Sequence, residues 1–450
     1  MQPSSGSRPR DAWATNAGFL LAAVGSAVGL GNMWRFSYIA TQGGGAAFVG
    51  IYLLLVAVIG VPVMTSEFIV GRMTQRSPIG ALRSLGGPRW VPLGWLFVAG
   101  GFGIISYYSV IAGWTMRYAV TALGPGIPAD TGVFFGEVAT GADALLWHVL
   151  FMGITVFIVY GGIKKGIERA SLILMPLLFL LLVGLAVWAF TLPESRAAYG
   201  AYLDPNLGQV FHRRILTDAA GQAFFSLSLG MGAMMTYASY IQTKHDLARE
   251  AVIVSACDFG VAFVAGLVVF PIVFTFGLRD LVGESSVGAL FISLPTGFAS
   301  MGAAGKLVGG GFFLMLFFAA LTSSISLLEV VVAAFVDRGW ARHRAALVFG
   351  LVAALTGVPS AFNTDFLGAV DAIVGNFLLI VGGLLICVFV GYRILPQADG
   401  ELARGLDSPI LRRLWAVLVR YVVPALLLAL LFFMLEPTWE AVKTLFTAWM

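Results

Sequence analysis

Long apolar stretches alternate along the chain with short charged or turn-rich segments. An α-helix needs about 20 predominantly apolar residues to cross a bilayer, and most of these stretches reach that length. They predict eleven spans, at residues 15–41, 46–71, 93–121, 145–161, 170–191, 215–243, 248–278, 307–336, 345–359, 366–392 and 414–436. The final stretch, 437–450, is too short and too polar to cross, so we expect a short interfacial helix there.

Composition agrees with this pattern. Only 11% of the 450 residues are charged, against roughly 25% in soluble domains, which excludes a soluble enzyme, a nucleic-acid binder and a fibrous protein. The two cysteines, Cys257 and Cys387, lie inside apolar runs and offer no disulfide or metal spacing. The sequence shows no nucleophile–base pair, nucleotide-binding loop or metal cluster, so we do not expect an enzyme.

The distribution of basic residues predicts the orientation. If the N-terminus is inside, the inner segments hold 18 basic residues and the outer segments six; lysine and arginine concentrate in cytoplasmic loops. We therefore expect a cytoplasmic N-terminus and an outer C-terminus. Arginine outnumbers lysine 22 to 5, which suggests a GC-rich bacterial source and hence a bacterial inner membrane. The longest outer segments, 122–144, 192–214 and 279–306, are expected to fold as caps.

Spans 1 and 6 carry glycines at mid-membrane depth, within Gly25–Asn32 and Phe225–Gly232. The two spans are five apart, so they hold the same place in successive five-helix units of opposite orientation. Unwound backbone is tolerated in a membrane only where it lines a cavity, and such pairs mark the substrate site of transporters with inverted repeats. Close helix packing is the alternative for a single glycine-bearing span, but two corresponding spans with polar side chains favour a substrate site.

These residues resemble a known family. Four segments carry the resemblance: Trp13-Ala14-Thr15, the run Gly25-Ser26-Ala27-Val28-Gly29-Leu30-Gly31-Asn32-Met33-Trp34-Arg35-Phe36, the run Gly43-Gly44-Gly45-Ala46 and the run from Gly221 to Gly230. They look like the neurotransmitter:sodium symporter family, in its prokaryotic amino-acid branch. One departure is Ser37, where the family usually has proline.

The resemblance implies an all-α polytopic membrane protein. About 11 transmembrane helices would form a 5+5 inverted repeat with unwound helices 1 and 6. Repeat 1 would cover about 13–191, repeat 2 about 215–393 and an extra helix about 414–436, all within one transporter domain. It also implies a sodium-coupled symporter that imports a neutral amino acid by alternating access. A carrier for an osmolyte or a γ-amino acid, and an amino-acid-binding membrane sensor, are the alternatives.

Two sodium sites are implied by the resemblance. The first would use Ala27, Asn32, Ser226 and Asp258 together with the substrate carboxylate. The second would use Gly25, Val28, Ala319, Thr322 and Ser323. Sodium is a hard cation served by oxygen ligands, as calcium and magnesium are. Back-bonding of hydroxyls to the preceding helical turn is the alternative for the Thr322–Ser323 pair.

Asp258 is the most informative single residue, because a carboxylate inside a span is costly and marks function by default. Many relatives have asparagine at this position, and the chloride-dependent ones place a serine one turn later, where this chain has Ala262. A fixed carboxylate can supply the charge that chloride gives elsewhere, so we expect no chloride requirement.

The resemblance also implies the substrate. Amine transporters of the family carry an aspartate where this chain has Gly29, so the ligand is expected to bring its own carboxylate. Tyr108 and the backbone near Leu30 and Gly31 would bind that carboxylate. Large neutral side chains, aliphatic or aromatic, are favoured. The full expected set is Ser26, Ala27, Leu30, Gly31, Ile104, Tyr108, Phe225, Ser226, Ser228, Met231, Ser323, Ser326 and Leu327.

Charged residues near the span ends suggest gates. Outside, Arg35 is expected to pair with Asp371, with Asp365 as the competing partner. Inside, Arg10 is expected to pair with Asp337, with Trp13 and Tyr240 packed around the pair. Exposed ion pairs contribute only about 0–1 kcal/mol, which suits a contact that opens every cycle. Glu67, near the inner end of span 2, is expected to be a partner of loop arginines.

Overall fold

The computed structural model describes residues 11–42, 45–204, 213–241, 246–278 and 289–447, and every secondary-structure element in these ranges is helical. Nine continuous helical segments of this described chain are long and apolar enough to cross a membrane. They are Ala46–Thr74, Pro88–Leu123, Gly141–Tyr160, Ile163–Ala189, Leu247–Thr275, Ala303–Val336, Arg342–Phe362, Thr364–Arg393 and Pro409–Thr447. The predicted all-α membrane fold is confirmed.

The other two predicted spans are interrupted helices. The first consists of α1 (Asn16–Ala27) and the segment Gly31–Thr41, which are bent by 60° at the break and count together as a tenth span. The second consists of α11 (Arg213–Ser226) and α12 (Ala233–Ala238). In its break Ser228, Gly230 and Gly232 all have positive φ angles, a conformation that ends a right-handed helix.

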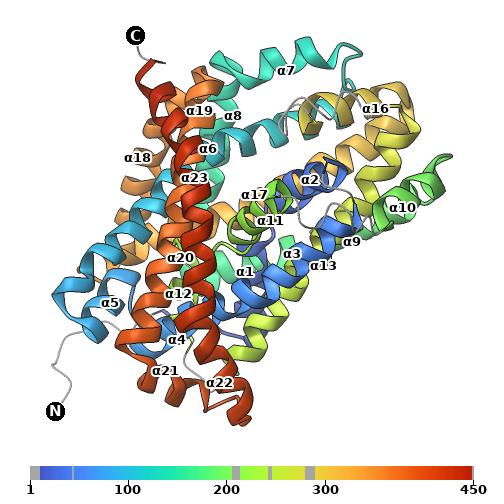
Figure 1. Ribbon diagram of the computed structural model, residues 1–450. Helices are drawn as coiled ribbons and strands as arrows, with labels where there is room; N and C mark the ends of the chain where they lie inside the picture. Colours follow the sequence, from blue (N-terminus) through green and yellow to red (C-terminus); the bar gives the residue numbers. More distant parts are fainter. Residues whose placement is uncertain (1–10, 43–44, 205–212, 242–245, 279–288, 448–450) are drawn as a thin grey trace.

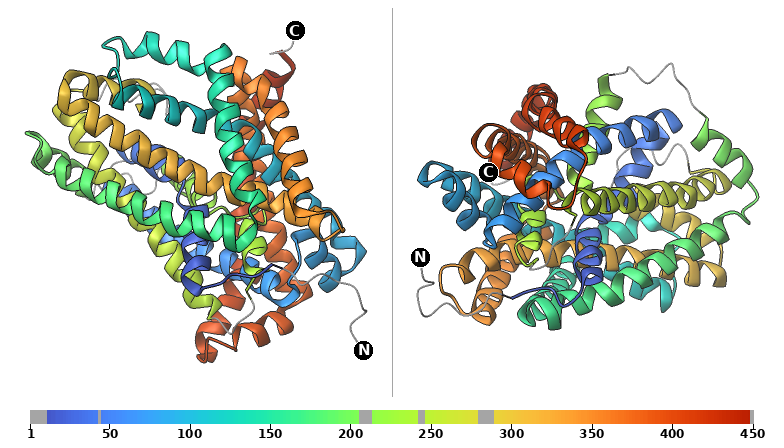
Figure 2. Two further views of the ribbon diagram at one scale, coloured as in Figure 1. Left: turned by 180° about the vertical axis from the view of Figure 1, so that it is seen from behind. Right: turned by 90° about the horizontal axis from the view of Figure 1, so that it is seen from below.

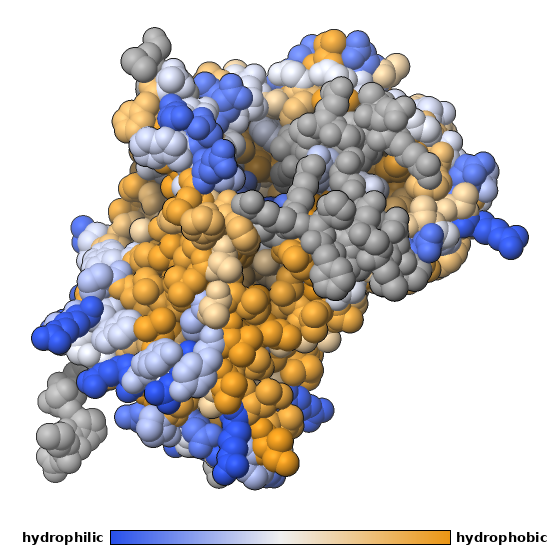
Figure 3. All heavy atoms as spheres, viewed as in Figure 1, coloured by the Kyte–Doolittle hydropathy of each residue, from blue (hydrophilic) through white to orange (hydrophobic). Residues whose placement is uncertain are grey.

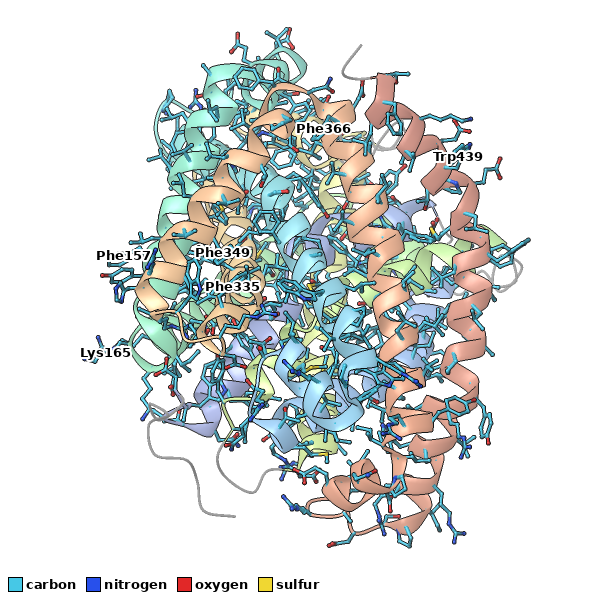
Figure 4. All side chains as sticks on the ribbon, turned by 90° about the vertical axis from the view of Figure 1, so that its left-hand side faces the viewer. Phe157, Lys165, Phe335, Phe349, Phe366 and Trp439 are labelled. Carbon is cyan, nitrogen blue, oxygen red and sulfur yellow. The ribbon has the colours of Figure 1, made fainter. Side chains whose placement is uncertain are left out.

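Two pairs of packed helices form the scaffold beside these breaks. α6 (Val91–Leu123) packs along α17 (Ala303–Val336), and α18 (Arg342–Phe362) packs against α8 (Gly141–Tyr160). Figure 4 shows Phe335 of α17 and Phe349 of α18 facing each other, with ring centroids 4.1 Å apart. Phe157 points outward from α8 in the same view and is 79% exposed, as a side chain facing lipid should be.

The remaining spans surround this scaffold. α3 (Ala46–Leu55) and α4 (Val61–Thr74) form one span, α9 (Arg169–Ala189) and α13 (Leu247–Thr275) two more, and α20 (Leu379–Val388) belongs to another. α23 (Val423–Thr447) packs against α20 at the periphery (Figure 2). An apolar band crosses the visible face, and hydrophilic residues collect at both ends (Figure 3).

Short helices mark the two ends of the bundle. α7 (Thr131–Ala139), α10 (Ser195–Leu203) and α16 (Leu294–Ser300) lie toward one end (Figure 1), within the segments that were expected to form caps. Toward the other end lie α5 (Pro78–Gly86), α21 (Leu395–Leu402) and α22 (Pro409–Val417), which the apolar pattern did not predict as separate helices.

The predicted separate helix at 437–450 is wrong. α23 continues through Pro437 to Thr447 without a break. Glu440 and Lys443 pair at 2.8 Å on this last part, both more than half exposed. The helix therefore continues past the point at which its apolar run ends.

Gly230 should be essential for stability. Its φ is +76°, and an added Cβ would lie 2.0 Å from the carbonyl oxygen of Leu379 on α20. Gly277 is a matched control, because its φ is +64° but nothing lies within 4 Å of an added Cβ. Backbone strain of this kind costs about 1–3 kcal/mol, so we expect Gly277→Ala to lower the melting temperature modestly. Gly230→Ala, which adds the overlap, should lower it much further or prevent folding. Equal shifts in both variants would refute the close contact.

Candidate substrate cavity and cation sites

A cavity lies where the two helix breaks meet. The lining residues come from the two interrupted helices and from the continuous helices α6 and α17. The lining residues are Ser26, Ala27, Gly29, Gly31, Asn32, Ile104, Tyr108, Phe225, Ser226, Ser228, Met231, Ser323 and Leu327. None of these lining residues carries a charge.

Eleven of the thirteen residues expected at the substrate site line this cavity. The other two stand directly behind the wall. The backbone N–H of Leu30 donates to the Tyr108 hydroxyl oxygen at 3.2 Å, and Ser326 Oγ accepts a hydrogen bond from the Ser26 hydroxyl at 2.7 Å. Gly29 lines the cavity itself, and a Cβ added there would lie 3.0 Å from Ser323 Oγ and 3.2 Å from the Tyr108 hydroxyl.

The first group of expected sodium ligands gathers around Asp258 of α13. Ser226 Oγ donates to this carboxylate at 2.8 Å, Asn32 Nδ2 at 2.6 Å and the Tyr52 hydroxyl at 3.0 Å. Asp258 is fully buried, yet none of these three donors is charged. A buried carboxylate normally requires a cationic partner or a metal. This arrangement therefore fits a bound cation, and Ser226 and Asn32 both reach the cavity wall.

The second group gathers where α17 crosses the end of α1. Ser323 Oγ lies 3.3 Å from the carbonyl oxygens of both Gly25 and Val28. Thr322 Oγ1 donates back to the Ala319 carbonyl at 3.0 Å. A Cβ at Gly25 would lie 2.9 Å from Thr322 Cβ, so glycine permits the close approach of the two helices. The five expected ligands thus lie together, with carbonyl and hydroxyl oxygens that suit a hard cation.

At the end of the bundle that was expected to face outward, Asn376 connects the charges that were expected to pair directly. Arg35 donates to Asn376 Oδ1 at 2.9 Å, and its guanidinium lies 5.7 Å from the Phe225 ring centroid. Asn376 Nδ2 in turn lies 3.4 Å from Asp371 Oδ2, while Tyr107 donates to Asp371 Oδ1 at 2.7 Å. Asp365, the competing partner, is exposed in the first turn of α19 (Thr364–Val370).

At the end that was expected to face inward, Arg10 lies outside the described residues, but its expected neighbours are described. The Trp13 indole N–H donates to the Tyr237 carbonyl at 2.9 Å, and the Trp13 backbone N–H donates to the Tyr240 carbonyl at 3.3 Å. Asp337 accepts from the backbone N–H of Ser77 at 2.5 Å. The beginning of α1 is therefore attached to α12 at this end.

Two carboxylates at this same end were not predicted from the sequence. Glu168 is buried and accepts from the backbone N–H groups of Ala14 and Thr15, at 2.8 and 3.0 Å, so it caps the beginning of α1. Glu329 of α17 is fully buried, accepts from the Tyr240 hydroxyl at 2.5 Å and forms an ion pair with Arg342. Glu329 had a detectable signal, since it is a carboxylate within a predicted span, as Asp258 is.

The expectation for Glu67 was wrong. Its carboxylate accepts from the backbone N–H groups of Gly230 at 2.9 Å and Met235 at 3.3 Å, in and just after the break between α11 and α12. Backbone groups freed by unwinding need partners inside a membrane, and Glu67 supplies one from α4. Glu67 therefore satisfies backbone N–H groups in and beside the break.

Removal of the Glu329 charge should destabilise the fold. Breaking a buried ion pair costs about 3–5 kcal/mol because it leaves the other charge uncompensated, so Glu329→Gln should lower the free energy of unfolding by that order. The exposed pair Glu440–Lys443 provides the control, since Glu440→Gln should change the stability by less than about 0.5 kcal/mol. Denaturant unfolding of both variants in detergent measures this difference. A Glu329→Gln effect as small as that of the control would contradict the prediction.

Two interrupted helices around an uncharged cavity, next to two groups of oxygen ligands, define a multi-pass membrane carrier with inverted repeats. The chain belongs to the Sodium:neurotransmitter symporter family, whose profile matches residues 10–132 and 139–442. This family assignment confirms the resemblance seen in the sequence.

Several relatives match over nearly the whole chain. The uncharacterised sodium-dependent transporter YhdH of Bacillus subtilis is 36% identical, covering 92% of this chain and 95% of the relative. The uncharacterised sodium-dependent transporter MJ1319 of Methanocaldococcus jannaschii is 33% identical, covering 94% and 90%. Among solved structures, MhsT in complex with L-phenylalanine is 38% identical, with a TM-score of 0.86 over 95% of this chain and all of that one.

Proposed function

We propose that this protein is a sodium-coupled symporter that imports a neutral L-amino acid with a large side chain by alternating access. The observation that carries the proposal is a cavity without charged side chains beside the Asp258 site. A substrate amine finds no carboxylate on the cavity wall, so a substrate that is neutral overall and supplies its own carboxylate fits best.

The carboxylate of such a substrate has a donor at Tyr108. The Tyr108 oxygen accepts from the N–H of Leu30 and lies beside the Ser323 hydroxyl. On substrate binding its hydroxyl group would donate to a carboxylate oxygen, which would also reach the cation beside Asn32. The amine is expected to meet carbonyl groups at the breaks, including those of Ala27 and Phe225. The Phe225 carbonyl accepts from the Ser228 N–H at 3.4 Å, and a carbonyl oxygen has a second lone pair for the amine.

Two sodium ions, and no chloride, would complete the transport cycle. The oxygen groups around Asp258 and around Thr322–Ser323 each suit a hard cation. Asp258 is a carboxylate that belongs to the protein and lies next to Tyr52 and Ser226. It would supply the negative charge that a bound chloride ion provides elsewhere. Ala262, one turn along α13, is fully buried and carries no hydroxyl that could help to bind chloride.

A large side chain is supported by the apolar part of the wall. Ile104, Met231 and Leu327 line the cavity, and methionine adapts easily to ligands of different shape. The similar transporter MhsT was solved in complex with L-phenylalanine. We further propose a bacterial inner membrane as the location, with the N-terminus inside and the C-terminus outside.

A binding screen tests this function. The purified chain would be titrated with each of the twenty amino acids, with betaine and with γ-aminobutyrate, in sodium and in choline buffers. We expect tight, sodium-dependent binding of large neutral amino acids, and accumulation of the same compounds in proteoliposomes along a sodium gradient. Preference for betaine or γ-aminobutyrate would favour the osmolyte or γ-amino-acid carrier, and binding without accumulation would favour a sensor.

A further inference from the structure

Two of the last spans cross closely near α21 and α22 (Figure 1). The π-helical segment Phe389–Arg393 follows α20, and the π-helical segment Leu418–Val422 joins α22 to α23. A Cβ added at Gly391 would lie only 3.0 Å from Arg420 Cα, so glycine permits the close approach. The Tyr392 hydroxyl donates to the Arg420 carbonyl at 2.9 Å and joins the two segments. π-Helical turns occur frequently at functional sites, and here two of them meet.

The guanidinium group of Arg420 lies beside two tyrosine rings at this crossing. Its Cζ is 5.0 Å from the ring centroid of Tyr392 and 5.4 Å from that of Tyr421, within the range of a cation–π contact. The two centroids are only 6.5 Å apart, so the rings cannot lie on opposite sides of the guanidinium group. Both tyrosines are 56% exposed, and Arg420 is partly buried. The rings therefore leave part of the cation uncovered.

The described part of the chain supplies no counter-charge for Arg420. None of the ion pairs found there includes this residue, and its Nε atom is buried without an acceptor. Arg412 differs, because it pairs with Asp399 at 2.9 Å. Arg393 and Arg413, both exposed, bring further positive charge to the same end of these spans. The crossing thus presents cations that the described residues do not neutralise.

The position of Arg420 along its span increases its need for a counter-charge. Residues 421–435, which follow it, are all uncharged. The next charge, Glu436, is about 24 Å further along the helix, whereas the hydrocarbon core of a bilayer is about 30 Å thick. Arg420 is therefore placed at the edge of the hydrocarbon core. Tyrosines are enriched at this depth, and long cationic side chains extend there toward the lipid headgroups.

We propose that this crossing binds an anionic phospholipid, whose headgroup phosphate lies on Arg420. The planar guanidinium group can donate two parallel hydrogen bonds to phosphate oxygens, and basic pockets between membrane helices suit anionic headgroups. Lipid binding at this crossing is independent of the proposed substrate and of sodium.

A lipid fits this place better than a soluble anion because apolar side chains continue from it. Leu428 and Phe432 follow Tyr421 by seven and eleven residues, the spacing of one helical face. They are 57% and 70% exposed. The acyl chains of a lipid whose phosphate lies on Arg420 would extend along this face of α23. A soluble anion would gain nothing from these side chains.

Native mass spectrometry of the purified full chain in detergent tests the proposal. The chain is titrated with phosphatidylglycerol or with phosphatidylcholine of the same acyl chains. We expect the first phosphatidylglycerol to bind about fivefold more tightly than the first phosphatidylcholine. Arg420→Gln should lose most of this preference. Arg420→Lys keeps the charge but loses the paired hydrogen bonds, so its preference should be intermediate.

Lys443→Gln is the matched control. It removes one positive charge from the same helix, but Lys443 is separated from Arg420 by the uncharged run and already pairs with Glu440 at 2.8 Å. Its lipid preference should equal that of the wild type. Melting temperatures in the same lipids give a second readout. Phosphatidylglycerol should raise the melting temperature of the wild type and of Lys443→Gln more than that of Arg420→Gln.

Three results would overturn the proposal. The first is equal affinity of the wild type for the two lipids, a comparison that does not depend on the folding of any variant. The second is an unchanged preference in Arg420→Gln. The third comes from a titration with inorganic phosphate: stabilisation equal to that by phosphatidylglycerol would indicate a site for a soluble anion. None of these measurements needs an amino acid or sodium, so failure of the proposed function would leave them unaffected.

Discussion

Replacement of Gly29 by aspartate is expected to abolish binding of the amino acid. The new carboxylate would project toward the Tyr108 hydroxyl and Ser323, which lie 3.2 and 3.0 Å from a Cβ at this position, and toward the place proposed for the substrate carboxylate. Two like charges about 4 Å apart repel by about 4 kcal/mol at an effective dielectric constant of 20. The dissociation constant should therefore rise at least about a hundredfold.

Gly29→Ala separates charge from volume. It introduces the same Cβ without the carboxylate, so it should weaken binding far less, as Ser323 and Tyr108 shift by a few tenths of an ångström. Binding of phenylalanine and of phenethylamine, its amine without a carboxylate, is measured for both variants by calorimetry. Only Gly29→Asp should lose phenylalanine selectively relative to phenethylamine. Equal losses in both variants would show that volume alone matters here.

Replacement of Asp258 by asparagine is expected to remove sodium-driven uptake at ordinary sodium concentrations. The buried carboxylate accepts from Asn32, Ser226 and Tyr52 and provides the negative charge of the proposed first sodium site. Charge-assisted contacts contribute about 1.5–3 kcal/mol, so the sodium concentration at half-maximal uptake should rise at least about tenfold.

The dependence on chloride gives the second readout for Asp258. Wild-type uptake should be unchanged when gluconate replaces chloride, whereas the double variant Asp258→Asn with Ala262→Ser should regain part of its uptake only in chloride. Asp365→Asn, which alters an exposed carboxylate on α19, is the control and should behave as the wild type. A severalfold loss of wild-type uptake in gluconate would refute chloride independence.

The sequence predicted the spans and the place of the cavity because both depend on local signals. Runs of apolar residues indicate membrane helices, and glycines in corresponding spans indicate the breaks. The residues expected at the substrate site then come together because the breaks after α1 and α11 line one cavity with Tyr108 of α6 and Ser323 of α17.

The contacts that could not be predicted depend on distant parts of the chain. Asn376 stands between Arg35 and Asp371 because the segment Asp371–Leu378 is a π-helix, in which the register shifts by a residue. Glu67 was expected to be a partner of loop arginines, because the sequence pattern alone cannot show that unwound backbone lies beside it. α5 and α21 were missed since short amphipathic helices lack a long apolar run.

The bend in the first span has a mechanical consequence. α1 has 12 residues and is therefore about 18 Å long, with the bonds to Glu168 at its far end and the cavity at the bend. If α1 turns about that bend by roughly 10°, its far end moves about 3 Å, given the length set by the helical rise, which is enough to break those bonds. The atoms at the pivot hardly move. A ligand bound at the bend can therefore stay in place while the far end of α1 moves.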